Sequence, residues 1–182
     1  MVRQPASRAD VEELYRRHAG ELRGYLYRRA GQAGADLLGE VFVVALQRLD
    51  DLPDPDVRRA WLFGVARRLL LAAQRDVRQR HDAEGERARF VEPADDHGAD
   101  GDDADRAGRT AAVRAALDSL SEPDRELVRL TEWERLPIAD AAVVLGLRPG
   151  TARVRLHRAR RALAAHPALA DLSPPRSLTR GG

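Results

Sequence analysis

The stretch that decides the fold spans residues 141–151 and reads AAVVLGLRPGT. Small and branched apolar residues form a short helical segment that ends at Gly146, where a left-handed backbone is favoured. Pro149 and Gly150 then complete a turn that is too tight for a long loop. This spacing predicts a helix-turn-helix. Its two helices are expected at about residues 137–145 and 150–164.

The second of these helices has two unlike faces. At 100° per residue, its apolar residues fall within an arc of about 60°; they are Ala152, Leu156, Ala159 and Leu163. Basic side chains occupy the rest of the surface, and Arg155 borders the apolar seam. Guanidinium groups bind phosphates and guanine edges, so the helix is predicted to bind DNA. A solvated helix in an ordinary bundle is the other interpretation.

Three helical stripes precede this motif. The first covers residues 11–26, with Asp10 as its expected N-cap. The segment from Gly31 to Gly34 breaks it, and Asp36 is expected to cap a second helix. After a proline-containing loop, a third helix is expected over about residues 58–80. Three helices with short connections can bury one shared core.

The third helix also carries a basic stripe. Arg67, Arg68, Arg75 and Arg78 lie within an arc of about 100°, and apolar side chains fill the opposite side. Such a stripe on one helix is equally consistent with a solvated surface. Two basic helical modules in one chain are more informative, because they favour binding at two separated places along one duplex.

Charge divides the chain into blocks. Residues 1–82 carry 15 Arg and 12 acidic residues, residues 83–109 carry 4 and 9, and residues 110–182 carry 12 and 8. The central block also contains glycines and few large apolar side chains, which predicts a flexible acidic linker. No segment alternates with period two, so the fold is predicted to be all-α with two small helical domains. The expected division is 1–10 N-terminal extension, 11–82 first domain, 83–109 linker, 110–167 second domain and 168–182 disordered tail.

Composition limits the possible chemistry. The 182 residues include 43% hydrophobic and 33% charged residues and no cysteine, which excludes disulfides, thiolate zinc sites and cysteine nucleophiles. No apolar run approaches the roughly 18 residues of a membrane span, so a cytoplasmic protein without membrane insertion is expected. Residues 81–82, 95–97 and 100–105 could offer metal ligands but lack partners on ordered elements. His18 lies on an apolar helical face and is expected to pack there. No enzyme activity, metal site or cofactor is predicted.

In their order and motifs, four segments resemble the extracytoplasmic-function sigma factors of bacterial RNA polymerase. Residues 36–42 (DLLGEVF) resemble region 2.2 of that family, and residues 59–67 (RAWLFGVAR) resemble region 2.3 leading into region 2.4. Residues 117–130 resemble the start of region 4, and residues 145–160 (LGLRPGTARVRLHRAR) resemble region 4.2. The two predicted domains then correspond to a region 2 bundle and a region 4 helix-turn-helix.

This resemblance implies partners and site residues. Contact with the β′ clamp helices of core RNA polymerase is implied for Asp36, Glu40 and Gln47. Recognition and melting of the minus-10 promoter element is implied for Asp54, Asp56, Arg58, Arg67, Arg68 and Arg75. Recognition of the minus-35 element is implied for Thr151, Arg153, Arg155 and Arg158, in a domain that also contacts the β flap. The resemblance further implies an anti-sigma protein as a partner. Trp61 matches a family tryptophan, but its apolar arc predicts a core position.

Three residues depart from the family pattern: Arg68 stands where Asn is usual, Ala72 where Asp is frequent, and Val154 where Ser is common. Other functions are open from the residues alone. A free-standing helix-turn-helix regulator explains residues 137–164 but leaves residues 36–80 without a role. A metal-dependent phosphohydrolase would lose activity on chelation, and a polymerase-binding adaptor would tolerate loss of the basic residues of the last helix.

Overall fold

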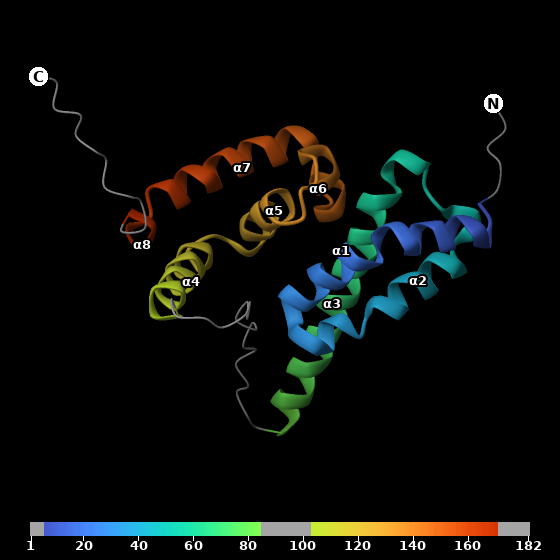
Figure 1. Cartoon of the computed structure of the whole chain (residues 1–182), viewed down its shortest axis with the longest axis horizontal. Helices are drawn as coiled ribbons and strands as arrows, with labels where there is room; N and C mark the ends of the chain where they lie inside the picture. Colours follow the sequence, from blue (N-terminus) through green and yellow to red (C-terminus); the bar gives the residue numbers. More distant parts are fainter. Residues whose placement is uncertain (1–5, 85–102, 171–182) are drawn as a thin grey trace, which may run out of the picture.

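The computed structural model describes residues 6–84 and 103–170, which form helices joined by short turns, with no strand in these ranges (Figure 1). The all-α prediction is therefore confirmed. Most of the expected linker, the first five residues and the chain beyond residue 170 lie outside the described residues. The N-terminal domain contains α1 (Arg8–Ala35), α2 (Leu38–Gln47), the 3-10 turns η1 (Leu49–Asp51) and η2 (Pro55–Val57), and α3 (Arg58–Glu84). The C-terminal domain contains α4 (Asp103–Asp118), α5 (Glu122–Glu132), α6 (Ile138–Leu145), α7 (Pro149–Ala164) and α8 (Pro167–Ala170).

The helix α1 begins earlier than its apolar stripe suggests. Ser7 is the N-cap: its hydroxyl accepts a hydrogen bond from the Asp10 amide at 3.4 Å, and the Asp10 carboxylate accepts one from the Ser7 amide at 2.9 Å. The prediction of Asp10 as N-cap is therefore wrong, because this capping box places Asp10 in the first turn. Hydrogen bonds from Ser7, and then from Arg58, lower the pKa of Asp10 to about 2.

The predicted break in α1 is confirmed as a bend. Gly31 adopts a φ of 59°, a left-handed conformation that glycine tolerates without steric cost. The helix then resumes, and Asp36 lies at its C-terminal end, where its amide donates to the Gln32 carbonyl at 3.0 Å. Asp36 therefore does not cap α2, as the sequence had predicted. The N-cap of α2 is Leu37, which offers no side-chain hydrogen bond.

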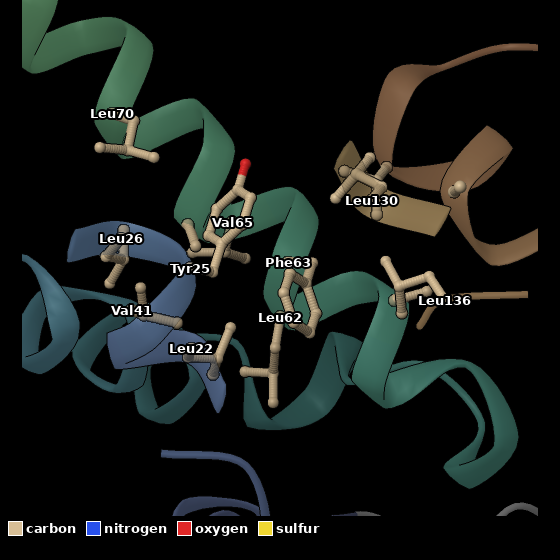
Figure 2. Packing of buried hydrophobic residues seen from close by; sticks show 14 of the residues in the cluster. Leu22, Tyr25, Leu26, Val41, Leu62, Phe63, Val65, Leu70, Leu130 and Leu136 are labelled. Atoms are coloured by element: carbon tan, nitrogen blue, oxygen red, sulfur yellow. The ribbon is translucent and has the colours of Figure 1, made fainter. Parts of the chain in front are cut away.

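The core of the N-terminal domain lies among α1, α2 and α3 (Figure 2). Leu22, Tyr25 and Leu26 of α1 are buried with Val41 of α2 and Phe63 of α3. The rings of Tyr25 and Phe63 meet edge to face with their centroids 5.2 Å apart. This packing fixes the direction of α3, which carries most of the residues predicted to act at the minus-10 element.

The C-terminal domain has the predicted helix-turn-helix. The helices α6 and α7 begin and end within one residue of the expected positions. Upstream, α4 begins at Asp103, so residues 103–109 are helical although they fall within the range expected to be a flexible linker. The short helix α8 packs against α4.

The two domains pack against each other. The helix α6 contacts α3, and one cluster of buried apolar residues includes members of both domains. Figure 2 shows Leu130 and Leu136 of the C-terminal domain beside the turn of α3 that carries Phe63. The basic and acidic faces of the two domains therefore have a defined placement relative to each other.

Gly146 provides a test of the turn. Its φ of 65° is left-handed, which costs an L-residue about 1–2 kcal/mol, although no atom lies within 4 Å of the position of an added Cβ. We expect Gly146→Ala to lower the free energy of unfolding by that amount in urea denaturation. Gly150→Ala is the matched control, because Gly150 lies in α7 with equally open space. Equal losses in both variants would contradict this account.

Candidate nucleic-acid interface

The turn between α6 and α7 is fixed by backbone hydrogen bonds. The amide of Leu147 donates to the Ala142 carbonyl at 2.8 Å, and the amide of Gly146 donates to the Val143 carbonyl at 3.2 Å. Pro149 then occupies the first turn of α7, where its missing N–H costs no helical hydrogen bond. The direction of α7 is therefore set within three residues of the end of α6.

One stripe docks α7 on the domain and leaves the opposite face exposed. Ala152, Leu156 and Ala159 are buried where α7 packs against α5 and α6, as the periodicity predicts. The predicted minus-35 residues Thr151, Arg153 and Arg158 are exposed. The neighbouring exposed residues of this face are Val154 and His157. The first two turns of α7 therefore present a basic, polar surface with the dimensions of a helix that enters a major groove.

Arg155, the fourth predicted minus-35 residue, has a different environment. Its Nε donates to Asp124 Oδ1 of α5 at 2.6 Å, and its side chain is only 31% exposed. The hydrogen bond from Arg155 lowers the pKa of Asp124 and raises the pKa of Arg155. This ion pair joins α7 to α5 across 31 positions of sequence, and periodicity gave no signal for it.

The residues predicted to act at the minus-10 element fall into two groups. Asp54, Asp56, Arg68 and Arg75 are exposed on the loop before α3 and on α3 itself. Arg68 and Arg75 make no hydrogen bond or ion pair with any residue that the structure describes. These two guanidinium groups are therefore available to a polyanion.

Arg58 and Arg67 form the second group, because both are held by the protein. Arg58 donates to the Pro53 carbonyl at 3.0 Å and to Asp10 Oδ1 at 2.9 Å, which ties the loop before α3 to the start of α1. Arg67 donates to Glu122 Oε1 of α5 at 3.2 Å, across the domain boundary. Both partners are remote in sequence, so the sequence pattern could not distinguish these two arginines from Arg68.

The residues predicted to contact polymerase lie on or next to α2. Asp36, Glu40 and Gln47 are all exposed. Glu40 and Gln47 are seven residues apart and share a helical face. Val43 is 50% exposed next to them, and sequence analysis had not singled it out. Trp61, in contrast, is partly buried against the core, as predicted.

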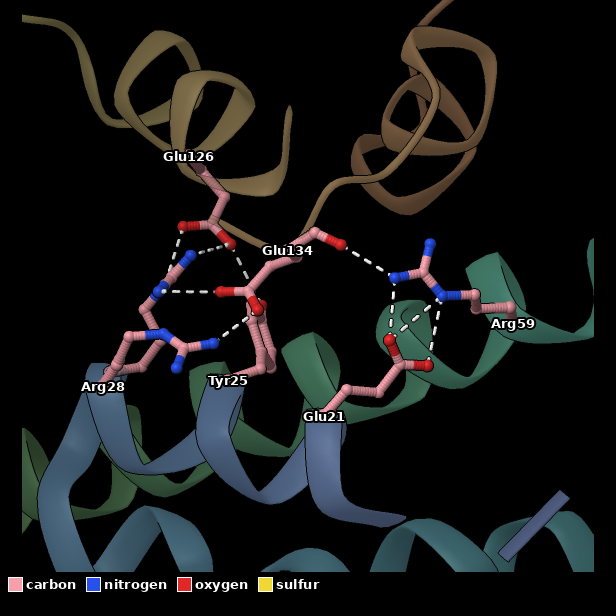
Figure 3. Close-up of polar contacts among 7 residues, drawn as sticks. Glu21, Tyr25, Arg28, Arg59, Glu126 and Glu134 are labelled. Atoms are coloured by element: carbon pink, nitrogen blue, oxygen red, sulfur yellow. Dashed lines mark hydrogen bonds and ion pairs between the residues drawn. The ribbon is translucent and has the colours of Figure 1, made fainter. Parts of the chain in front are cut away.

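A cluster of charged and polar side chains lies between the domains (Figure 3). We name it the interdomain cluster: Tyr25, Arg28 and Arg29 of α1, Glu126 of α5, and Glu134, which follows α5. The Tyr25 hydroxyl and Arg29 Nε donate to the Glu126 carboxylate at 3.0 Å each. Arg28 Nη2 donates to Glu134 Oε2 at 2.5 Å, and Arg29 Nη1 lies 3.7 Å from Glu134 Oε1. Sequence analysis did not predict this cluster.

Burial dominates the electrostatics of the interdomain cluster. Arg29, Glu126 and Glu134 are each less than 8% exposed. Burial raises the pKa of Glu134, although the charges of Arg28 and Arg29 oppose this effect. Burial and the charge of Glu126 raise the pKa of Tyr25 well above its ordinary value. Burial alone would lower the pKa of Arg29, but the charges of Glu126 and Tyr25 raise it.

Comparison with known proteins places this geometry in a family. The family described as "Sigma-70, region 4" matches residues 110–163, which contain the helix-turn-helix. The sigma factor CarQ of Myxococcus xanthus is 35% identical over 154 residues, covering 81% of this chain and 83% of CarQ. The ECF sigma factor SigL of Mycobacterium tuberculosis is 30% identical over 165 residues, covering 87% of this chain and 89% of SigL. The chain belongs to the extracytoplasmic-function sigma factors.

A solved structure extends the comparison to the fold of this sigma factor. The sigma factor RpoE of Bartonella quintana, determined in complex with the anti-sigma factor NepR, superimposes with a TM-score of 0.64. It is 25% identical, and the match covers 85% of this chain and 94% of RpoE. The helical order assigned to regions 2 and 4 from sequence therefore holds over most of the chain.

Two further sequence expectations concern membranes and metals. Within the described ranges, every helix of this sigma factor is too short or too polar to cross a bilayer. Among the same residues, no group of three or more His, Asp or Glu side chains is placed to hold a metal ion. The side chains of His81 and Asp82 and the segment at residues 95–97 lie outside the described part.

The Arg155–Asp124 pair can be tested by a double-mutant cycle. The partly exposed pair is expected to contribute about 0.5–1 kcal/mol to the free energy of unfolding. Arg155→Ala, Asp124→Ala and the double variant should therefore lose similar amounts. Because the pKa of Asp124 is lowered in the folded state, this contribution should be present at neutral pH and lost as the pH falls below about 4.

Urea denaturation at pH 7 and at acidic pH measures these effects. Arg158→Ala is the control, because Arg158 is exposed on the same helix, and its stability should not change. Additive losses in the double variant would contradict a direct coupling between Arg155 and Asp124.

Proposed function

We propose that this sigma factor recognises the minus-35 promoter element with the exposed face of α7. Thr151, Arg153 and Arg158 would contact base edges and phosphates in the major groove. The single observation that supports this most is the docking of α7 by its narrow apolar stripe, which leaves these three residues exposed together. Arg155, the fourth residue expected there, would reach DNA only by leaving Asp124.

The minus-10 element is assigned to the exposed part of α3 and the loop before it. Arg68 and Arg75 would bind the backbone of the opened strand, and Asp54 and Asp56 would flank the extruded bases. Opening a duplex costs a few kcal/mol of stacking per base, which such contacts must offset. Arg58 supports this site as an anchor of the loop, and Arg67 would join it after separating from Glu122.

Core RNA polymerase is the proposed protein partner. The exposed face with Asp36, Glu40 and Gln47 would contact the β′ clamp helices, and the C-terminal domain would contact the β flap. An anti-sigma protein is a second proposed partner. Supporting this second proposal, RpoE of Bartonella quintana and the structural neighbour CnrH were both solved in complexes, with the anti-sigma factor NepR and with the cytosolic domain of CnrY respectively.

The polymerase contact is tested with purified core enzyme. We expect the full chain to co-elute with core RNA polymerase from a sizing column without DNA or metal. The double variant Asp36→Arg/Glu40→Arg should bind core enzyme more weakly by on the order of tenfold or more, because it places like charges at the interface. The control Glu13→Arg/Asp50→Arg reverses two other exposed carboxylates of the same domain and should retain binding.

The outcome separates the two main functions. Wild-type protein that fails to join core polymerase but binds promoter duplex tightly alone would contradict a sigma factor mechanism. That result would favour a free-standing helix-turn-helix regulator, which is expected to bind DNA without polymerase.

Promoter contacts are tested in the holoenzyme. Arg153→Ala and Arg158→Ala should each weaken specific promoter binding by about 1–3 kcal/mol if their guanidinium groups contact base edges. Arg68→Ala should reduce open-complex formation, measured by permanganate footprinting, more than it reduces polymerase binding. Arg16→Ala removes an exposed arginine from α1 with the same change in charge and is the control. Equal loss by Arg68→Ala in the polymerase and open-complex assays would contradict a role in melting.

A further inference from the structure

We infer that the interdomain cluster is a latch that holds the free sigma factor in a closed form, which must open before both promoter elements can be bound. This inference rests on the proposed function, because it concerns regulation of the same DNA-binding surfaces. The cluster is suited to this role since each domain supplies charges of one sign. Arg28 and Arg29 come from α1, and Glu126 and Glu134 come from the C-terminal domain.

The latch is buried and involves more than one pair. Glu126 accepts hydrogen bonds from Tyr25 and Arg29, and the Arg29 guanidinium also stacks 4.6 Å from the centre of the Tyr25 ring. Arg59 of α3 adds a second bridge, because its Nη2 donates to the Glu134 backbone carbonyl at 2.7 Å (Figure 3). The same Nη2 donates to Glu21 Oε2 of α1 at 2.7 Å. The contact therefore links α1 and α3 to the C-terminal domain through side chains that are already oriented.

Closure engages a surface that promoter DNA would need. Arg67 faces Glu122 of the C-terminal domain at 3.2 Å. An interdomain cavity of about 740 Å³ lies beside it, lined in part by Arg29, Arg67, Asp118 and Glu122. Carboxylates of the C-terminal domain thus occupy positions next to a basic stripe of α3, where they would repel phosphate groups. DNA and the C-terminal domain compete for this side of α3.

Promoter geometry requires the domains to separate. The names of the two elements place them about 25 base pairs apart, which is about 85 Å along straight duplex at 3.4 Å per base pair. A compact chain of 182 residues has a radius of gyration of about 16 Å and is roughly 40 Å across. The closed form therefore cannot place α3 and α7 on both elements at once.

The polar contacts of the latch are incomplete, which is what a reversible device requires. Glu134 Oε1 and Arg28 Nε are buried without a hydrogen-bond partner among the described residues. A buried ion pair gains little net stability because desolvation offsets much of the attraction between the charges. Core polymerase can therefore open the latch by binding the separated domains more tightly than the closed form.

The full chain allows a direct test, because it contains no cysteine and accepts two specific labels. Arg23→Cys on α1 and Ala162→Cys on α7 are both exposed positions for a fluorescent donor and acceptor. We expect efficient energy transfer in the free protein and reduced transfer when Glu126→Gln/Glu134→Gln removes both carboxylates. Arg28→Gln/Arg29→Gln removes the same pairs from the other domain and should give the same result.

The control is Glu13→Gln/Glu132→Gln, which changes net charge equally but removes ion pairs within single domains, to Arg17 and Arg160. It should leave energy transfer unchanged. In unlabelled protein, the latch variants should bind core polymerase more tightly than wild type. The gain is about tenfold if the closed form outnumbers the open form by ten to one.

Three outcomes would overturn the latch: low transfer already in the wild-type chain, unchanged transfer in the latch variants, or opening without any gain in affinity for core polymerase. A different result would count against the proposed function instead. In that case neither the wild type nor any variant binds core polymerase, and the transfer measurement on the free chain still decides whether the cluster closes it.

Discussion

The carboxylates of Glu126 and Glu134 are buried against counter-charges that belong to the other domain. Removing a carboxylate from water costs several kcal/mol even after relaxation, and only nearby cations with good geometry compensate for it. Arg28 and Arg29 provide those cations from α1. The placement of the two DNA-binding surfaces relative to each other depends on this constraint, because apolar contact alone would tolerate several orientations.

The helix α3 is the structural link between this constraint and function. It packs against α1 and α2 to complete the N-terminal core, and it also contacts α6 of the helix-turn-helix. Its arginines therefore divide by position. Arg59 and Arg67 face the C-terminal domain, whereas Arg68 and Arg75 remain exposed. A single helix thus supports a core, a domain interface and a basic surface.

Among the extracytoplasmic-function sigma factors, this chain has an unusual arginine at position 68. The family resemblance leads us to expect an amide side chain there, which can donate to and accept from a base edge. A guanidinium group only donates and carries a full charge, so it favours phosphate or an acceptor edge. Its exposure means that this difference faces the ligand and is not absorbed by the protein core.

Local sequence was sufficient where the decisive contacts are local. Gly146 and Pro149 indicated the helix-turn-helix, and the spacing of Ala152, Leu156 and Ala159 identified the docked face of α7. The family resemblance added the order of the domains. Errors occurred at helix ends: Ser7 caps α1 in place of Asp10, because an apolar stripe marks the buried face of a helix and not its first residue.

The sequence by itself determined the helices, their buried faces and the family of this protein, because these follow from periodicity, turn residues and motif order. Only the tertiary structure decided which arginines are held by the protein and which are available to DNA. Arg58, Arg67 and Arg155 resemble Arg68 in the sequence, but Asp10, Glu122 and Asp124 engage them across 48, 55 and 31 positions. A helical stripe records which side of a helix a residue occupies, but the partner on that side comes from elsewhere in the chain, and only folding brings the two together.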